Sequence, residues 1–312
     1  EPILVRGDTP GKLRYFDIGD YLTTDQKLAK VDSLRSIAKI PWSNVPPSED
    51  GDWIGMRSAE FERFHNLGDK TGQPVTRFFD QYGAGLQTNR DAWVYNDSAP
   101  ALRSHVSSMI ETYNNEIDRW IAAGSPTPTE KFVSLDATKI SWSRSLRNSL
   151  SKTQHGSLDT SAIRGAVYRP FQKRNVYFDK LLNHERSLLP RMFPAQDASN
   201  LGFYIPGHGS GHGLSTLIVN EIPDVAFWGS AAGYFFPRYT YEKRVADDNQ
   251  LLGFDGDDQP EYVRIDNVTD GILADYRATY GDALPADDTA AKDDIFFYVY
   301  GLLHSPEYRE RF

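Results

Sequence analysis

Positively charged and aromatic side chains alternate closely in residues 167–194, VYRPFQKRNVYFDKLLNHERSLLPRMFP. Cations held on an aromatic scaffold suit contact with a polyanion such as nucleic acid. The alternative is a solvated strand and loop whose arginine stems lie along apolar surface with their charged ends in water. β-Branched and aromatic residues predict a short strand at Asn175–Phe178. The basic residues of this stretch are Arg169, Lys173, Arg174, Lys180, Arg186 and Arg191.

A second dense stretch, residues 78–96 (FFDQYGAGLQTNRDAWVYN), places polar side chains directly before aromatic ones. Gly83 and Gly85 permit a tight turn. Asn89 and Arg90 then offer an amide and a guanidinium, which are groups that bind nucleic acid. The alternative is a turn whose polar groups satisfy their own backbone.

Two histidines offer a different chemistry. His208 and His212 lie four residues apart in the sequence GHGSGHG, and with loop carboxylates they could serve a metal- or histidine-dependent hydrolase. The intervening glycines disfavour a helix that would direct both rings at one metal ion. The stretch has no lysine and matches neither the phosphate-loop nor the dinucleotide-binding spacing. The hydrolase is therefore kept as an alternative hypothesis.

The distribution of charge is more informative than its total. The chain of 312 residues has a net charge of −9, which argues against a freestanding nucleic-acid binder. Residues 139–191, however, hold eleven Lys and Arg against three Asp and Glu, whereas residues 242–312 hold seven against seventeen. A basic middle beside an acidic tail predicts that residues 139–191 form the face for a polyanion. The absence of cysteine excludes disulfides, and no apolar run reaches the roughly 20 residues of a membrane span.

The elements that would position these residues are both helices and strands, so the predicted fold class is α/β in the sense of mixed α+β. A strand at 13–18 precedes a helix that begins with a capping box, Thr23 to Gln26. Apolar residues at spacings of three and four predict a long helix between Asp97 and Gly124. Further expected elements are strands across 165–241, an apolar helix at 294–304 and a second helix that begins at Ser305-Pro306.

Four stretches of the chain resemble one protein family. They are FDIGDYLTTDQKLAKV (16–31), LQTNRDAWVYN (86–96), YRPFQKRNVYFDKLLN (168–183) and FFYVYGLLHSPEYRERF (296–312). Together they are similar to the C-terminal third of type ISP restriction–modification enzymes, single-polypeptide systems often labelled as DNA helicases. The resemblance is ordered along nearly the whole chain.

The resemblance implies a segment of a longer polypeptide that carries a nuclease, an ATPase motor, a coupler, an adenine-N6 methyltransferase and a target recognition domain. Residues 1–45 look like the C-terminal remnant of the methyltransferase. Residues 46–312 look like the target recognition domain, with 46–160 and 161–312 as its two lobes. The segment has no S-adenosylmethionine loop, methyltransferase motif or Walker motif. We therefore expect no catalysis and no cofactor here, and S-adenosylmethionine, ATP and Mg²⁺ only in the parent enzyme.

The implied partners are double-stranded DNA and the remaining domains of the same polypeptide, in the cytoplasm and away from membranes. Lys and Arg would contact phosphates, while other side chains would read base edges. Because family members read different targets, residues in the shared stretches are expected to be scaffold or phosphate contacts, and base readers are expected within 144–164. The candidate DNA-binding residues are Asn89, Arg90, Arg144, Arg147, Lys152, Gln154, Arg164, Arg169, Lys173, Arg174 and Arg186.

A third hypothesis gives the chain a purely structural role. In this case the acidic tail and the helix at 294–304 would dock other domains of the parent polypeptide. Weak DNA binding that ignores sequence, even at low salt, would favour this hypothesis over target recognition.

Overall fold

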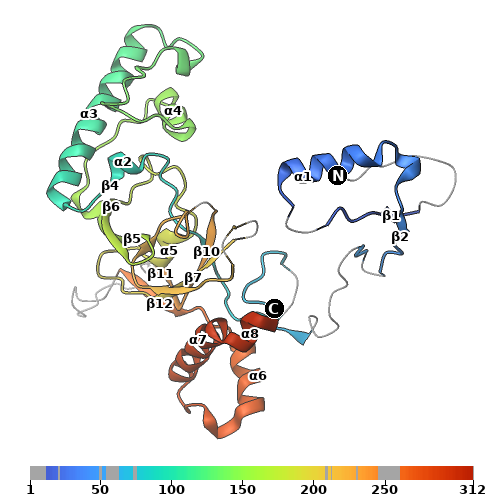
Figure 1. Ribbon diagram of the computed structural model, residues 1–312. Helices are drawn as coiled ribbons and strands as arrows, with labels where there is room; N and C mark the ends of the chain where they lie inside the picture. The colour runs from blue at the N-terminus through green and yellow to red at the C-terminus, as the bar shows by residue number, and fades with distance from the viewer. Residues whose placement is uncertain are drawn as a thin grey trace. The chain divides into compact units, whose positions relative to one another are not determined.

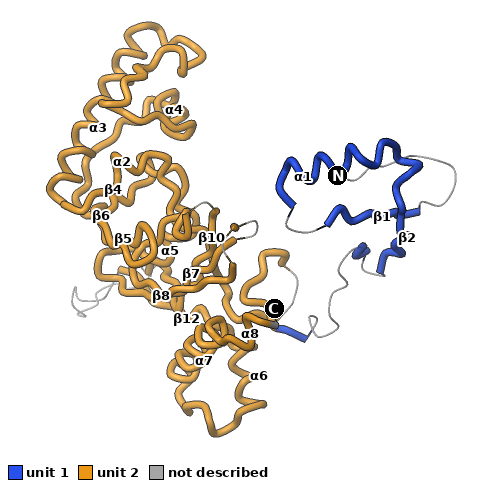
Figure 2. Tube along the Cα trace, viewed as in Figure 1, with its two compact units in different colours: residues 1–64 blue, residues 65–312 orange. Residues whose placement is uncertain are grey.

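The structure is a computed structural model that describes residues 12–19, 22–48, 51–53, 63–72, 76–207, 210, 211, 213–229, 231–244 and 261–311. The chain divides into two compact units, residues 1–64 and 65–312 (Figure 2). The domain boundary expected near residue 45, and the two lobes expected after it, stay predictions.

The first unit contains one helix and a two-stranded ladder. Strand β1 (Arg14–Tyr15) pairs antiparallel with β2 (Ser43–Asn44). Helix α1 (Thr24–Leu34) begins with the predicted capping box, because the Thr23 side chain accepts from the backbone of Gln26 and the Gln26 side chain accepts from the backbone of Thr23. The 3₁₀ turn η1 (Ile37–Lys39) follows. No residue of α1 is buried, so the helix has no packed face within the described residues.

A four-stranded sheet forms the middle of the second unit. Its order is β4 (Tyr95–Asn96), β6 (Gln172–Tyr177), β5 (Ile163–Arg169) and β9 (Ile222–Pro223), with only β9 parallel to its neighbour. Strands β5 and β6 form a hairpin whose turn holds Phe171 at a positive φ of 63°. The strand predicted at 175–178 is thus largely confirmed as the end of β6.

The remaining strands form a second four-stranded sheet and a separate two-stranded ladder, and they confirm the β-rich second half of the chain. Antiparallel pairing brings β3, from near the start of the unit, against β10, which lies about 150 residues later. The sheet has the order β3 (Gly83–Ala84), β10 (Gly233–Pro237), β7 (Gly202–Pro206) and β8 (Leu217–Val219), and the ladder pairs β11 (Tyr239–Lys243) with β12 (Tyr262–Asp266).

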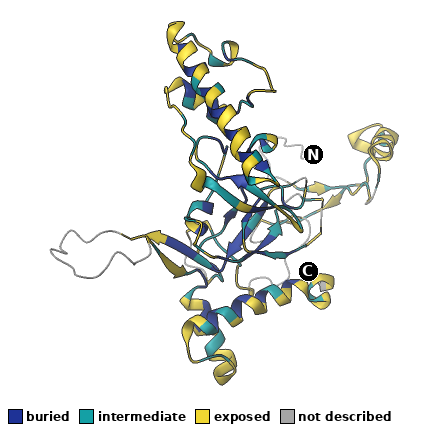
Figure 3. Ribbon diagram, turned by 90° about the vertical axis from the view of Figure 1, so that its left-hand side faces the viewer, coloured by how far each residue is buried: buried dark blue, intermediate teal, exposed yellow. Residues whose placement is uncertain are grey.

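Helices lie at both ends of the second unit (Figures 1 and 3). The predicted long helix is α3 (Ala99–Ala122), with Ser98 as N-cap and Pro100 in the first turn. Its buried face carries Leu102, Val106, Ile110, Tyr113, Ile117 and Trp120, and α4 (Arg144–Ser151) lies beside it (Figure 1). The short helices are α2 (Asp91–Val94) and α5 (Leu189–Met192), with 3₁₀ turns η3 (Thr129–Lys131) and η4 (Thr160–Ala162).

The opposite end is built from α6 (Asp270–Tyr280), η5 (Gly281–Ala283), α7 (Asp288–His304) and α8 (Pro306–Arg311). Helix α7 begins earlier than the apolar run at 294 because Asp287 caps its start through Ala290. An aromatic cluster holds α7 against the sheet, with Phe79, Phe203, Phe236 and Phe296 all buried. In the described ranges no helix has the length and apolar character needed to cross a membrane.

Candidate nucleic-acid interface

Helix α4 is anchored by one face. Leu146 and Leu150 are fully buried in the core beneath it. The side chain of Ser143 caps its start by accepting from Leu146 N at 3.2 Å, and Arg90 Nη2 donates to the same hydroxyl at 2.5 Å. The inner face of α4 is therefore fixed by packing and by its cap.

The outer face of α4 is basic and polar. Arg144, Arg147, Asn148 and Ser151 are spaced by three and four residues, which places them on one side of the helix, and all but Arg147 are exposed. Lys152 and Gln154 follow as exposed residues at its end. Within the described residues Arg144, Arg147 and Lys152 form no ion pair. We call this surface, residues 144, 147, 148, 151, 152 and 154, the α4 face.

Arg90 lies beneath the α4 face and not on it. The residue is only 4% exposed, and its guanidinium donates to Leu182 O and Ser143 Oγ, each at 2.5 Å. Burial lowers the pKa of Arg90 to about 10. This geometry supports the scaffold role expected for a residue of the shared stretches, because Arg90 holds the start of α4 from inside.

Three basic residues of the β5–β6 hairpin, Arg169, Lys173 and Arg174, are paired with carboxylates. The Arg169 guanidinium also stacks on Tyr168 at 3.9 Å from the ring centroid. Arg174 lies 5.5 Å from the same centroid. The carboxylate partners are Asp224 for Arg169 at 2.8 Å, Glu221 for Lys173 at 3.1 Å and Asp97 for Arg174 at 2.8 Å. The positive charges of these three residues are therefore offset by carboxylates of the same chain.

Arg164, which also lies on β5, and Arg186 are half-buried and take no part in these ion pairs. Arg164 donates through Nη2 to the carbonyl oxygen of Ala195, and Arg186 lies 5.2 Å from the Phe178 ring centroid. Burial lowers the pKa of both guanidinium groups. Among the described residues, neither Arg164 nor Arg186 forms a hydrogen bond or ion pair with α4.

A buried carboxylate lies behind the hairpin. Asp224 is 3% exposed and accepts from Tyr95 Oη at 3.2 Å, from Ala226 N at 2.9 Å and from Arg169 Nη1 at 2.8 Å. Burial raises the pKa of Asp224 to about 6 despite these donors. The adjacent Asp91 accepts from Tyr168 Oη at 2.9 Å.

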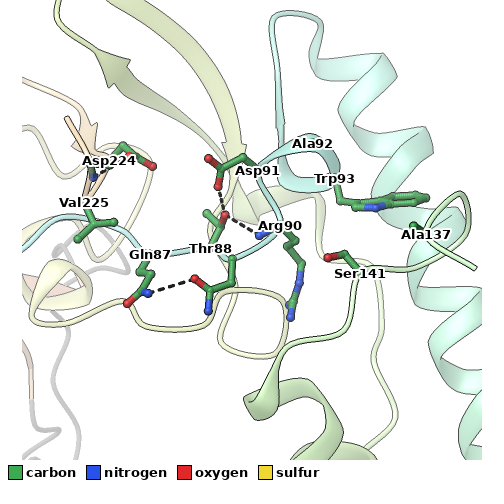
Figure 4. Close-up of a pocket in the computed structure, with 12 residues that line it drawn as sticks. Gln87, Thr88, Arg90, Asp91, Ala92, Trp93, Ala137, Ser141, Asp224 and Val225 are labelled. Atoms are coloured by element: carbon green, nitrogen blue, oxygen red, sulfur yellow. Dashed lines mark hydrogen bonds between the residues drawn. The ribbon is translucent and has the colours of Figure 1, made fainter. Parts of the chain in front are cut away.

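An open hollow of about 570 Å³ lies where the loop before α2 meets the segment after β9 (Figure 4). Asn89 is exposed on this loop, and its Oδ1 accepts from Gln87 Nε2 at 3.1 Å. Gln87 and Asn148 were not among the residues predicted from the sequence to bind DNA. Alternation could have indicated Gln87, since Leu86 and Thr88 are buried on either side of it. The lining is Gln87, Thr88, Asn89, Arg90, Asp91, Ala92, Trp93, Ala137, Ser141, Asp224, Val225 and Ala226.

The residues proposed for a hydrolase receive no support from geometry. His208 and His212 lie outside the described residues. In the part of the chain that is described, no group of three or more His, Asp or Glu is arranged to hold a metal ion. The hydrolase stays a hypothesis without a located site.

Residues 77–312 match the family model described as the Type ISP C-terminal specificity domain. The chain belongs to this family. The resemblance seen in the sequence is thereby confirmed, and so is the mixed α+β fold, which solved structures of type ISP enzymes share. No curated protein matches the chain.

Three solved structures are similar to the chain, each with a TM-score of 0.72. A nuclease-deletion mutant of the type ISP enzyme LlaGI, in complex with a DNA substrate mimic, is 32% identical over 98% of this chain. The ATP-dependent type ISP enzyme LlaBIII bound to DNA is 28% identical over 96%. A DrdV–DNA complex, 23% identical over 96%, supports the fold alone. The specificity-domain chain spans only 25%, 18% and 27% of those three chains.

Proposed function

We propose that this chain recognises a specific sequence in double-stranded DNA, as the target-recognition part of a larger restriction–modification polypeptide in the cytoplasm. The observation that carries the proposal is the α4 face. Its three cations have no carboxylate partner among the described residues, and they lie on a helix and its C-cap that are anchored from beneath. The DNA complexes of LlaGI and LlaBIII support the same conclusion.

The α4 face offers both kinds of contact that target recognition needs. Arg144, Arg147 and Lys152 would bind phosphates or, for an arginine, the O6 and N7 atoms of guanine. Asn148 and Gln154 carry amides, which can pair with the N6 and N7 atoms of adenine. An α-helix of this kind fits the width of the major groove.

The proposal is tested by selecting bound sequences from a pool of random duplexes with the purified chain, and by measuring affinity as a function of salt. We expect enrichment of one sequence and a steep fall of affinity with rising salt, because bound phosphates release counterions. Binding that enriches no sequence at any salt concentration would overturn the proposal and favour the structural hypothesis.

We further propose that methylation, ATP-driven translocation and cleavage, with S-adenosylmethionine, ATP and Mg²⁺, belong to other parts of the polypeptide. The chain itself contains none of the motifs for these reactions. Methyl-transfer and ATPase assays on the purified chain should therefore show no turnover. Turnover that a point substitution within the chain abolishes would contradict this division of labour.

A docking role is favoured by one observation at the other end of the domain. On the outer side of α7, Phe297 and Tyr298 are 52% and 50% exposed within the acidic region of the chain. Apolar side chains on an acidic surface suit a protein partner better than DNA. In the full polypeptide, the double variant Phe297→Ser and Tyr298→Ser should loosen this docking, so a protease should cut between the domains faster. The selected DNA sequence should not change. An unchanged rate of proteolysis would contradict the docking role.

A further inference from the structure

Gln87 and Asn89 form a pair of amide side chains at the hollow shown in Figure 4. Gln87 Nε2 donates to Asn89 Oδ1 at 3.1 Å. This bond leaves the Gln87 Oε1 acceptor and the Asn89 Nδ2 donor without a partner among the described residues. Turning both amides by 180° would exchange their roles, but the pair would still present one acceptor beside one donor.

The backbone beneath this pair is fixed on several sides. Gln87 exchanges two backbone hydrogen bonds with Glu185, each of 2.9 Å. Leu86 N donates to Pro223 O at 2.8 Å, and its own carbonyl accepts from Val225 N at 2.9 Å. Asn89 adopts a left-handed backbone conformation with φ 56°, and the side chain of Thr88 donates to Asp91 beneath the loop. The backbone that carries the amide pair is therefore held in place before a ligand binds, which lowers the entropy cost of binding.

An acceptor beside a donor is the complement of one base edge in the major groove. Adenine offers the N6 amino group as donor and N7 as acceptor, whereas guanine offers two acceptors. Cytosine offers only a donor, and thymine offers an acceptor beside a methyl group. A pair with one acceptor and one donor satisfies both adenine positions and leaves one group unsatisfied on each of the other bases.

The charged groups around the hollow do not compete for this role. Asp224 is occupied by Arg169 and Tyr95, and Asp91 by Tyr168 and Thr88. Arg90 points into the core toward Leu182 and Ser143. Among the described residues of this loop, the amides are thus the groups that remain available to recognise a ligand. They would do so through directional hydrogen bonds and not through charge.

We infer that Gln87 and Asn89 together read an adenine in the target sequence, at a position separate from the bases read by the α4 face. The inference rests on the proposed function and deepens it. It assigns adenine specificity to a loop from near the start of the domain, outside the basic segment. This departs from the expectation that residues of the shared stretch 86–96 are scaffold or phosphate contacts, because the pair offers an acceptor beside a donor and a phosphate needs donors only.

Two substitutions remove the amides while sparing the fold. Gln87→Met keeps the length of the side chain without its polar atoms. Asn89→Gly removes the side chain and tolerates the left-handed backbone. Lys243→Gln, on an exposed residue of β11 paired with Glu261, is the matched surface control. The thermal unfolding of each variant reports whether the fold is kept.

The experiment is the selection of bound duplexes by the wild-type chain and by each variant. We expect one position at which the wild type selects adenine to become degenerate in both amide variants, while the other positions and the Lys243→Gln control stay unchanged. Affinity for the wild-type sequence should fall about 5- to 150-fold. Replacing that adenine with 7-deaza-adenine should weaken the wild type and leave the variants almost unaffected.

The possible outcomes are distinct. Variants that select the wild-type sequence at every position overturn the inference and leave the proposed function intact. Variants that lose affinity equally for all sequences also overturn it, because the amides would then contact the DNA backbone. A wild-type chain that selects no sequence overturns the proposed function itself.

Discussion

Two sets of three cations in the candidate region differ in how the structure pairs them. One set lies on α4 and its C-cap (Arg144, Arg147 and Lys152), and the other lies on the β5–β6 hairpin (Arg169, Lys173 and Arg174). Each cation of the hairpin set faces a carboxylate that lies 48 to 77 residues away in the sequence. On α4, within the described residues, none does. A count of charges along the sequence therefore overstates the charge that the hairpin can offer to DNA.

The difference matters because a phosphate must compete with whatever already pairs with a cation. Exposed ion pairs stabilise a protein little, but they cancel the local field that attracts a polyanion. The cations of the α4 face are not offset in this way, so their positive potential remains. We therefore expect the α4 face to contribute most of the affinity for DNA, while the hairpin positions the loops around that face.

The largest effect is expected from neutralising the α4 face. Arg144→Gln, Arg147→Gln and Lys152→Gln together should lower the slope of log affinity against log salt by about three units, roughly one for each lost phosphate contact. The matched control is Arg169→Gln, Lys173→Gln and Arg174→Gln on the hairpin, measured at a temperature at which it stays folded. Equal losses of slope in the two triple variants would erase the comparison.

The next effect concerns stability and not DNA. Arg169→Met leaves Asp224, whose side chain is 4% exposed, without its cation. Breaking such a pair is costly, and because Arg169 is itself 30% exposed we expect a loss of about 2–3 kcal/mol in the free energy of unfolding. Urea unfolding measures this. Arg191→Met, which breaks an exposed pair with Glu242, should change it by less than about 1 kcal/mol.

The same carboxylate should give stability a pH dependence. Burial raises the folded-state pKa of Asp224 from 3.8 to about 6, so the folded protein holds this proton more tightly than the unfolded chain does. The resulting stability is fully present below about pH 4 and is lost as the pH rises through about 6. Relative to Asp224→Asn, the wild type should lose roughly 2–3 kcal/mol between those limits. A constant difference between the two proteins across this range would show that Asp224 does not titrate there.

The smallest effect is expected at the exposed end of the hairpin. Lys173 and Glu221 pair at 3.1 Å, with side chains 62% and 29% exposed. A double-mutant cycle of Lys173→Gln and Glu221→Gln should give a coupling free energy below about 1 kcal/mol. A larger coupling would mean that the hairpin pairs do more than cancel charge.

Local patterns in the sequence predicted much of the fold. The capping box at Thr23, the helix that became α3 and the strand at the end of β6 follow from capping chemistry, periodicity and β propensity. The predicted start of the last long helix was late, since Asp287 caps it ahead of the apolar run. The first residue of a helix can depend on a single capping side chain, which the spacing of apolar residues does not reveal.

The candidate site was less accessible to sequence reasoning, because its properties depend on pairs distant in the chain. Nothing near Lys173 or Arg174 in the sequence indicates that Glu221 and Asp97 would face them. The burial of Arg90 likewise depends on Ser143 and Leu182 from other segments. The residues of α4 could be proposed from the sequence because their spacing and solvent exposure are local properties.

The closure of the domain by its last elements has a consequence for its synthesis. The side chain of Asn267 forms hydrogen bonds with both the N–H and the carbonyl of Gln81, which lies 186 residues earlier in the sequence. The ring centroids of Phe79 and Phe296 lie 6.0 Å apart. At about 5–20 residues per second a ribosome takes roughly 10–40 s to make the intervening chain. During that time Phe79 and Gln81 lack these partners. A nascent chain that stops before α7 would leave Phe79, Phe203 and Phe236 uncovered, and we expect it to aggregate or be degraded.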